Sequence, residues 1–339
     1  MMRLAIDKVI NYKDLREDEM SDVMNIIMEG RATASQIGGF LTALRMKGET
    51  LEEITGAAKA MREKAIKIET NSNYTVDTCG TGGDKSNTFN ISTAAAFVAA
   101  AASVTIVKHG NRSMSSKCGS ADVLESLGVN INLSPIDIKR SIDELQIGFI
   151  FAPNFHQSMK YAIHPRKELG IRTIFNILGP LTNPANPKGQ VLGVFDEDLT
   201  TIMAQSLKNL GLERCMVVHG LDGLDEITIT TKTKVSELKN GEIYEYYLDP
   251  KDYGIPFNQI EKIQGGNPEE NAEILLDILK GEKGPKRDMV LLNAGAAMYV
   301  GKEVDSLEDG IEKSKEIIDK GLALEKLNQL IKFSQEMKK

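Results

Sequence analysis

Residues 1–65 place their hydrophobic side chains at helical spacing. The apolar residues of 20–28 fall on one helical face, as do those of 37–44, whose helix we expect to end at Lys47-Gly48. Thr50 and Glu53 have the spacing of a capping box and predict the start of a third helix. Helices this short bury little surface alone, so they are expected to pack on the rest of the chain or on a second copy of themselves.

Beyond residue 75, short apolar runs alternate with helical patterns. The runs lie at 104–107, 149–151, 191–194, 216–218 and 289–292. The Ala-rich stretch 94–102 is expected to be a tightly packed helix, and the charged segment 307–339 is expected to be helical with a solvated face. This alternation is typical of an α/β fold with a mainly parallel central sheet flanked by helices.

This pattern predicts two domains. A small all-helical domain is expected over residues 1–70 and a large α/β domain over 75–339, with a hinge at Asn71-Ser-Asn-Tyr-Thr75. The Pro-containing segment around 160–185 is expected to return to the N-terminal helices. Residues 184–187 would then form the second strand of the hinge.

Composition narrows the classes of partner. The formal net charge of −7 argues against a nucleic-acid partner, because neutralising a phosphate backbone needs a basic surface. The 3 cysteines include no Cys-x-x-Cys pair, so neither a disulfide framework nor a zinc site is expected. No signal peptide and no apolar run of about 18 residues is found, so we expect a cytoplasmic protein without a membrane partner.

Two glycine- and hydroxyl-rich segments each follow a predicted strand. Asp77-Thr-Cys-Gly-Thr-Gly-Gly-Asp84 leads through Asn90-Ile-Ser-Thr93 into the Ala-rich helix, and residues 108–116 follow the run at 104–107. Glycines let backbone N–H groups approach an anion, and a helix N-terminus adds a positive dipole there. The spacing fits neither a P-loop nor a dinucleotide-binding turn. The two segments therefore predict a pocket for a ligand with several phosphates, with Lys108 and Arg112 adding charge.

In this order and spacing, GTGGD at 80–84, NIST at 90–93, KHGNRS at 108–113 and GSADVLESLG at 119–128 resemble the anthranilate phosphoribosyltransferases. RKELGIRTIFNILGPLTNP at 166–184, HGLDGLDE at 219–226 and LNAGAA at 292–297 are similar to further signatures of that family. The resemblance implies magnesium-dependent transfer of the phosphoribosyl group of 5-phosphoribosyl 1-pyrophosphate to the amine of anthranilate, in tryptophan biosynthesis. It also implies a homodimer joined through the small helical domain.

The resemblance also implies which residues form the site. No protein nucleophile is implied, and His109 is given a supporting role near anthranilate. Anthranilate binding is implied for Gly80, Asn111 and Arg166, and Mg²⁺ binding for Ser92, Asp225 and Glu226. The positions implied to bind phosphoribosyl pyrophosphate are Gly80, Gly83, Asp84, Thr88, Asn90, Ile91, Ser92, Thr93, Lys108, His109, Gly110, Asn111, Arg112, Ser113, Met114, Ser115, Ser116 and Ser120.

Several roles stay open at this point. Asp84 is an unusual neighbour for phosphates and could orient Lys108, orient the ribose hydroxyls or cap the following turn. Asp225 and Glu226 would point to opposite faces of a strand, so both reach one site only if their loop turns. His164-Pro165 departs from the family pattern and could shift the helix start before Arg166.

The main rival is a pyrimidine nucleoside phosphorylase, which has the same architecture. That family carries a Lys-His-Ser-Thr-Gly-Gly turn where this chain has Asp77-Thr-Cys-Gly-Thr-Gly-Gly, and it lacks the Gly-Pro-Leu-Thr-Asn-Pro segment found at 179–184. A transferase-like or nucleic-acid-binding paralogue that has lost anthranilate would be expected to lose Arg166 or the Asp225-Glu226 pair and often to be basic, whereas this chain keeps both and is acidic. The complete catalytic loops argue against an interaction module built on the N-terminal helices.

Overall fold

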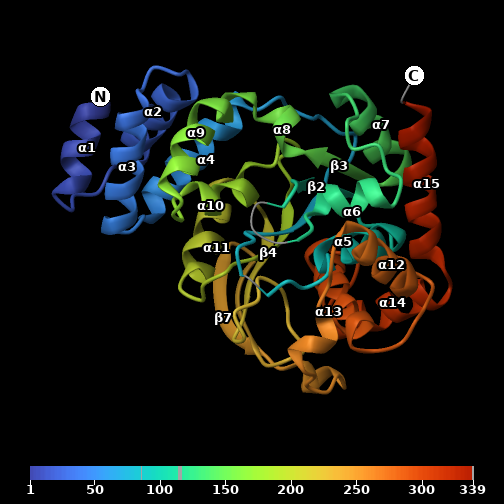
Figure 1. The fold of residues 1–339 in the computed structure, drawn as a ribbon. Coiled ribbons are helices and arrows are strands. Elements are labelled where there is room, and N and C mark those ends of the chain that lie inside the picture. The colour runs from blue at the N-terminus through green and yellow to red at the C-terminus, as the bar shows by residue number, and fades with distance from the viewer. Residues whose placement is uncertain (85, 114–116, 338–339) are drawn as a thin grey trace.

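The large part of the chain is built on one sheet. In the computed structural model, which describes residues 1–84, 86–113 and 117–337, the strand order is β3-β2-β1-β4-β5-β6-β7 (Figure 1). Strands β3, β2, β1, β4 and β5 run parallel, and β6 and β7 are antiparallel to their neighbours. The strands are β1 Val76–Gly80, β2 Ile106–Gly110, β3 Ile147–Phe151, β4 Gly189–Gly193, β5 Arg214–Gly220, β6 Thr233–Lys239 and β7 Glu242–Leu248. The mainly parallel sheet predicted from the sequence is confirmed.

The strand order reverses direction at β1. The chain moves outward from β1 to β2 and β3, and then returns to the other side of β1 with β4. Gly80 pairs with Gly193 at the carboxyl ends of β1 and β4. In open sheets of this kind, ligands bind outside the carboxyl ends of the strands where the order reverses. The loops after β1, β2, β4 and β5 all leave from that edge.

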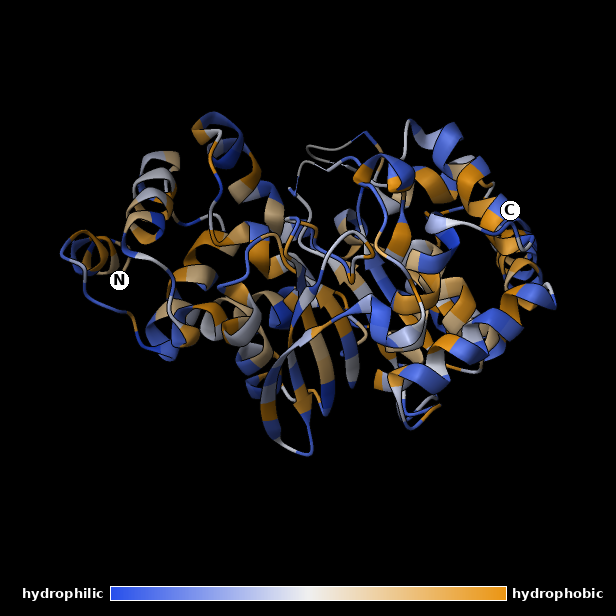
Figure 2. Ribbon diagram, turned by 90° about the horizontal axis from the view of Figure 1, so that it is seen from below, coloured by the Kyte–Doolittle hydropathy of each residue, from blue (hydrophilic) through white to orange (hydrophobic). Residues whose placement is uncertain are grey.

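Side chains of the central strands alternate between two hydrophobic cores. Along β4, Val191 faces one core and Leu192 the other; along β5, Val218 and Val217 divide in the same way. The first core lies under the C-terminal helices and the second under the N-terminal helices and α11 Leu199–Asn209. Figure 2 shows hydrophobic and hydrophilic residues alternating along the hairpin β6–β7 at the edge of the sheet, where β7 is mostly exposed.

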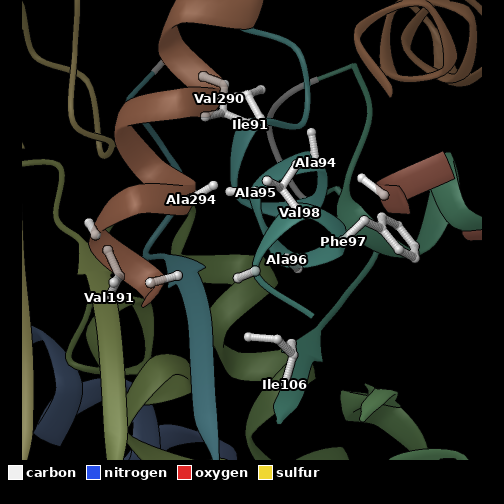
Figure 3. Close-up of a cluster of buried hydrophobic side chains, with 14 of the residues drawn as sticks. Ile91, Ala94, Ala95, Ala96, Phe97, Val98, Ile106, Val191, Val290 and Ala294 are labelled. Carbon is white, nitrogen blue, oxygen red and sulfur yellow. The ribbon is translucent and has the colours of Figure 1, made fainter. Parts of the chain in front are cut away.

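The Ala-rich run forms α5 Ile91–Ala101, which is buried along almost its whole length. Figure 3 shows its small side chains between α13 and the strands, with Ala95 beside Ala294 and Ala96 above Ile106. Small residues let the helix axis come close to both layers, so the position of the α5 N-terminus over the carboxyl edge is set by packing. The C-terminal helices beside it are α12 Pro268–Leu279, α13 Pro285–Val300, α14 Leu307–Asp319 and α15 Leu322–Glu336.

The N-terminal helices lie at one end of the molecule, beside α9 (Figure 1). They are α1 Met2–Ile10, α2 Glu17–Met28, α3 Ala34–Lys47 and α4 Leu51–Lys64. The capping box is confirmed, since the Thr50 side chain accepts from Glu53 N and the Glu53 carboxylate accepts from Thr50 N at 2.8 Å. The end of α3 before Gly48 is confirmed as well.

The excursion between β3 and β4 lies against these helices. It contains α8 Ala152–Phe155, η1 Gln157–Met159, α9 Lys160–Leu169, α10 Phe175–Leu178 and η2 Gly179–Thr182. Helix α9 contacts α2 and α3, and η2 contacts α4. The elements that complete the fold are α6 Ser120–Ser126, α7 Pro135–Leu145, η3 Pro250–Tyr253 and η4 Ile260–Ile263. None of the helices in the described ranges is both long and apolar enough to cross a membrane.

Two features of the sheet differ from expectation. The apolar run 289–292 is not a strand but the middle of α13, where Pro285 begins the helix and the side chains are buried all around. A helix covered on every side has no polar face, so its sequence resembles that of a buried strand. The hairpin β6–β7 was not anticipated, because β7 is an exposed edge strand whose tyrosines and glutamates hide the apolar signal.

Candidate active site

The first glycine-rich loop is fixed at several points to the carboxyl edge of the sheet. Gly82 and Gly83 have φ of 67° and 80°, a backbone region that favours glycine. Thr81 N donates to Gly193 O at 2.9 Å, and Gly82 N donates to the Asp225 carboxylate at 2.6 Å. From the excursion, the Arg172 guanidinium donates to Gly83 O. These contacts give the loop a defined shape at the edge of the sheet.

The Asp84 side chain turns back on its own loop. Its carboxylate accepts from Ser86 N at 3.4 Å and from the Ser86 hydroxyl. Of the three roles left open by the sequence, this geometry matches a cap on the following turn. The Lys108 ammonium is engaged elsewhere, since it donates to Thr78 O and, at 3.3 Å, to the Ser92 hydroxyl.

The N-terminus of α5 points at the same place. Ser92 N donates to the Glu226 carboxylate at 3.2 Å, so the first turn of the helix meets the acidic loop after β5. The Ile91 side chain is buried in the hydrophobic core, so this position can offer a ligand only its backbone. Thr88 forms an isolated antiparallel bridge with Gln264.

Asp225 and Glu226 both reach this site because their loop turns. Gly220 N donates to Leu224 O at 2.9 Å and Gly223 has φ of 95°, so the chain reverses between β5 and the acids. A Cβ at Gly193 would overlap the Asp225 backbone, and a Cβ at Gly80 would overlap the Asp225 carboxylate. Glycine at both strand ends therefore lets the acidic loop lie directly on the sheet edge.

Burial dominates the electrostatics of the two acids. It raises the pKa of Asp225 to about 7, with a further contribution from nearby Asp84, and raises the pKa of Glu226 to about 8, with a contribution from Asp225. Lys108 opposes the shift at Glu226. The charged forms of both carboxyls are therefore disfavoured here, and a bound cation would stabilise them.

The donor set fits Mg²⁺. Two carboxylates and the Ser92 hydroxyl are hard oxygen ligands, and magnesium is usually held by one or two carboxylates plus phosphates of its substrate. In the ranges that the structure describes, no three His, Cys, Asp or Glu side chains form a ready-made metal-binding group. This donor set suits an ion that shares its coordination with a phosphate ligand.

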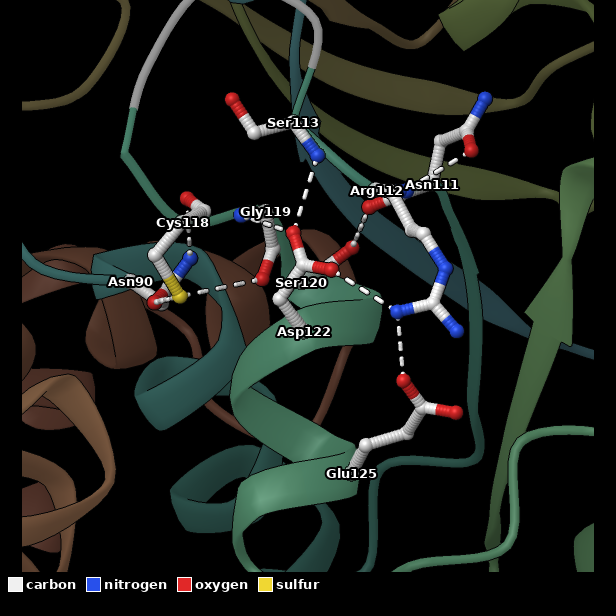
Figure 4. Close-up of polar contacts among 9 residues, drawn as sticks. All are labelled: Asn90, Asn111, Arg112, Ser113, Cys118, Gly119, Ser120, Asp122 and Glu125. Carbon is white, nitrogen blue, oxygen red and sulfur yellow. Dashed lines mark hydrogen bonds and ion pairs between the residues drawn. The ribbon is translucent and has the colours of Figure 1, made fainter. Parts of the chain in front are cut away.

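The second loop is organised by Asp122 on α6. Its carboxylate accepts from Gly119 N at 2.8 Å, from Ser113 N at 3.0 Å and from the Arg112 guanidinium at 3.0 Å (Figure 4). Arg112 also pairs with Glu125 at 2.5 Å. The Ser120 hydroxyl donates to Asn111 O at 3.3 Å, and Gly110 ends β2. Met114, Ser115 and Ser116, expected to bind phosphate, lie outside the described residues.

Two histidines lie beneath the excursion. The rings of His109 and His156 are 5.1 Å apart, and the Nε2 atom of each is buried without a hydrogen-bond partner in the described part of the chain. Burial lowers the pKa of His109 to about 3 and that of His156 to about 4. Both imidazoles are therefore neutral at neutral pH. His109 can therefore donate or accept a hydrogen bond, but it offers no positive charge to an anion.

Arg166 lies in the last turn of α9, half-buried, with its guanidinium 4.9 Å from the centre of the Phe175 ring. The helix begins at Lys160 and includes Pro165, so the unusual His164-Pro165 pair does not set its start. Within the described ranges, no hydrogen bond joins Arg166 to Gly80 or Asn111, the other residues expected at anthranilate.

Arg172 was not singled out from the sequence. Besides its bond to Gly83, its guanidinium stacks 4.1 Å from the centre of the Phe195 ring, just after β4. Arg172 thus joins the excursion to the first glycine-rich loop. Its place in the same Arg166–Pro184 string, six residues after Arg166, is the signal that could have identified it.

Comparisons with known proteins agree with this geometry. The model of the family described as "Glycosyl transferase family, a/b domain" matches residues 72–324, and that described as "Glycosyl transferase family, helical bundle domain" matches residues 3–65. Anthranilate phosphoribosyltransferase of Alkaliphilus metalliredigens is 67% identical over 338 residues, covering 100% of both chains. That of Acetivibrio thermocellus is 62% identical over 334 residues, covering 98% of this chain and 97% of the relative.

Solved structures give the same result. The crystal structure of anthranilate phosphoribosyltransferase from Thermus thermophilus matches with a TM-score of 0.93 at 42% identity, over 98% of this chain and 99% of that one. The Saccharomyces cerevisiae enzyme in complex with phosphoribosyl pyrophosphate and Mg matches with a TM-score of 0.91 at 28% identity, over 99% and 98%.

Proposed function

The chain belongs to the anthranilate phosphoribosyltransferase family, and we infer that it transfers the phosphoribosyl group of 5-phosphoribosyl 1-pyrophosphate to the amine of anthranilate. The products are N-(5-phosphoribosyl)anthranilate and pyrophosphate, and the step is magnesium-dependent and belongs to tryptophan biosynthesis. The observation that carries this conclusion is the convergence of the Gly80–Asp84 loop, the α5 N-terminus and the Asp225-Glu226 pair at the point where the strand order reverses.

We propose that Ser92, Asp225 and Glu226 hold the magnesium. When bound, the ion neutralises negative charge that develops on the departing pyrophosphate. Lys108 supplies the fixed positive charge beneath it, because its ammonium already bonds the Ser92 hydroxyl and lowers the pKa of Glu226. Burial of the acids favours this role, since an unpaired buried carboxylate is costly and is relieved by a cation.

The phosphates are proposed to lie on the two loops. Backbone N–H groups of the first loop and the first turn of α5 face the edge, and the helix dipole favours an anion there. Arg112 of the second loop pairs with Asp122 and Glu125. These exposed pairs are weak enough for a pyrophosphate to replace.

Arg166 is proposed to bind the anthranilate carboxylate. A guanidinium offers a planar pair of donors that matches a carboxylate, and stacking on Phe175 holds its plane. His109 and Asn111 would line the same pocket from the end of β2. No protein nucleophile takes part. The chain contributes positioning and electrostatic stabilisation, the main terms for such a transfer.

We also propose the domain division and the assembly. Residues 1–70 and the excursion 160–185 would form the small domain, and the remainder from residue 75 the large one. Leu4 and Ile10 on α1 and Met46 on α3 are exposed apolar side chains at the N-terminal end, which supports a homodimer joined through these helices. The cytoplasmic location expected from the sequence is likewise a proposal.

The test is the loss of anthranilate fluorescence on mixing the protein with phosphoribosyl pyrophosphate and Mg²⁺. We expect turnover that stops when either the second substrate or the metal is left out. Cleavage of a pyrimidine nucleoside by phosphate, with anthranilate fluorescence unchanged, would instead identify a nucleoside phosphorylase.

A further inference from the structure

A segment far along the chain lies directly on the first phosphate loop. Gln264 bridges to Thr88, and Gly265 N donates to Asn87 O at 2.9 Å. A Cβ at Gly265 would lie 2.7 Å from Phe89 Cα, which no real side chain tolerates, so glycine is required for this approach. The segment 264–271 therefore supports the backbone of the phosphate loop just before α5.

At the end of this segment, Asn271 reaches the loop with its side chain. Gly266 N donates to Asn271 Oδ1 at 2.7 Å, which fixes the amide orientation because a backbone N–H can only donate. The Nδ2 atom of Asn271 therefore points away and donates to Asn90 Oδ1 at 3.0 Å. Asn271 is almost completely buried, and no other orientation of its amide satisfies both neighbours.

The orientation of Asn90 follows from that of Asn271. With its Oδ1 committed to Asn271 and to the Cys118 thiol at 3.3 Å, its Nδ2 donates to Cys118 O at 3.3 Å. Cys118 precedes Gly119 and Ser120 at the end of the second phosphate loop. One amide thus ties the first loop to the second, and Asn271 holds that amide in place (Figure 4 shows Asn90 beside Cys118).

In this arrangement the Asn90 side chain does not cap the helix that it precedes. Asn90 is the N-cap residue of α5, and an asparagine there usually accepts from the backbone N–H of the second or third helical residue, here Ser92 or Thr93. Its side chain makes no such bond. A cap in that position would lie where the phosphates are proposed to bind and would use the Thr93 N–H, since Ser92 N already donates to the Glu226 carboxylate.

We propose that Asn271 is a positioning residue for phosphoribosyl pyrophosphate, acting through Asn90. It keeps the Asn90 amide off the N-terminus of α5 and in the bridge to Cys118, so that the helix donors and the second loop both face the ligand. This proposal rests on the assignment of the Asn90 loop to phosphoribosyl pyrophosphate made above.

The test compares the steady-state constants of the wild type with those of five variants. In Asn271→Ala, the Asn90 amide is released to cap the helix, so we expect the KM for phosphoribosyl pyrophosphate to rise about three- to tenfold, the usual effect of one buried hydrogen bond. The KM for anthranilate at saturating phosphoribosyl pyrophosphate should change less than about twofold. Asn271→Asp keeps an acceptor for Gly266 N and so keeps the turn, but it cannot donate to Asn90. It should show the same one-sided rise, and it serves if the alanine variant does not fold.

Two controls distinguish a positioning role of Asn271 from a general loosening of α12. Glu270→Ala removes the exposed neighbour whose carboxylate caps Asn267 N at 2.8 Å, and it should leave both KM values unchanged. Because Asn271 acts through Asn90, the double variant Asn90→Ala/Asn271→Ala should be no worse than Asn90→Ala alone. Additive losses, or an equal rise in both KM values for Asn271→Ala, would overturn the proposal. An Asn90→Ala variant with an unchanged KM for phosphoribosyl pyrophosphate would instead remove the site assignment on which it rests.

Discussion

The adjacent carboxyls of Asp225 and Glu226 are energetically unfavourable in this fold. Asp225 and Glu226 are neighbours at a half-buried site, desolvation raises the pKa of both, and the buried Lys108 lowers that of Glu226 in part. Such a pair opposes folding unless a cation binds, so its presence points to function and not to stability. The same reasoning separates these acids from the many exposed carboxylates of the chain.

We therefore expect the double variant Asp225→Asn/Glu226→Gln to lose at least about a hundredfold in turnover while its melting temperature stays equal or rises. The amides keep the shape of the loop and remove two mutually repelling charges. Turnover is measured by anthranilate fluorescence at limiting Mg²⁺, and unfolding by circular dichroism. Turnover near that of the wild type would show that the metal binds elsewhere.

Arg166 permits a test that separates the two substrates. Replacing it by Ala removes a charge-assisted bidentate contact, which costs about 1.5–3 kcal/mol, so the KM for anthranilate should rise roughly ten- to a hundredfold. The KM for phosphoribosyl pyrophosphate should change much less. Lys167→Ala, at the next and exposed position of α9, is the matched control and should change neither. If both KM values rise together in the Arg166 variant, the arginine supports the fold of the excursion.

At the scale of helices and strands, the sequence patterns predicted those elements that are determined by residues close together in the chain. The helices of residues 17–64, the Ala-rich α5 and the parallel strands follow from spacing and capping, since neighbouring residues determine them. The run 289–292 became a helix because α13 is enclosed on all sides. Two hydrogen bonds join residues that are far apart in the sequence: Arg172 to Gly83, and Asn271 to Asn90. No local sequence pattern predicts them. The resemblance of the motifs identified the loops, whereas the contacts that fix their shape could be found only in the folded structure.

The crossing of the acidic loop over β4 gives a prediction at this scale. In Gly193→Ala the added methyl group would overlap the Asp225 backbone, so the whole 220–226 loop must move. We expect a lower melting temperature together with loss of Mg²⁺-dependent turnover. Gly179→Ala is the control, because a Cβ there meets no atom within 4 Å and its φ is not positive. Normal turnover of the Gly193 variant would show that the loop need not lie on the strand end.

For the whole molecule, the buried histidines link stability to pH. Burial lowers the pKa of His156 to about 4, below its unfolded value of about 6.5, so its contribution to folding is complete above pH 6.5 and is lost as pH falls toward 4. The raised pKa of Asp77, Asp225 and Glu226 acts in the opposite direction, so the histidine is isolated by difference. The gap in unfolding free energy between the wild type and His156→Gln should shrink from pH 7 to pH 5 by up to about 1.4 kcal/mol per pH unit. The exposed His164→Gln variant should show no such trend in urea titrations.

If the two substrates bind as proposed, they lie on different parts of the molecule, and we expect a motion to bring them together. The phosphate loops leave the sheet, whereas Arg166 lies on the excursion that packs against the N-terminal helices. Backbone bonds hold each side of the connection: Ile68 N donates to Pro184 O at 3.3 Å on the helical side, and Lys188 N donates to Thr75 O at 3.0 Å on the sheet side. The hinge proposed from the sequence, Asn71–Thr75 with residues 184–187, lies about these bonds, and closure would also have to accommodate the bond from Asn71 N to the Asp143 carboxylate at 2.9 Å.

We therefore expect the helical part, residues 1–70 with the excursion, to rotate as a rigid body toward the sheet when both substrates are bound. Closure would bring Arg166 and its anthranilate over C1 of the ribose and exclude water from an oxocarbenium-like centre. Arg172, which already joins the excursion to Gly83, would carry the first loop along with it. Crystal structures of the free enzyme and of a complex with phosphoribosyl pyrophosphate and an unreactive anthranilate analogue should differ in the angle between the two parts. X-ray scattering should show a smaller radius of gyration in the complex than with phosphoribosyl pyrophosphate alone. An identical angle in both states, with the analogue seated on Arg166, would mean that the pocket is preformed and that diffusion alone brings the substrates together.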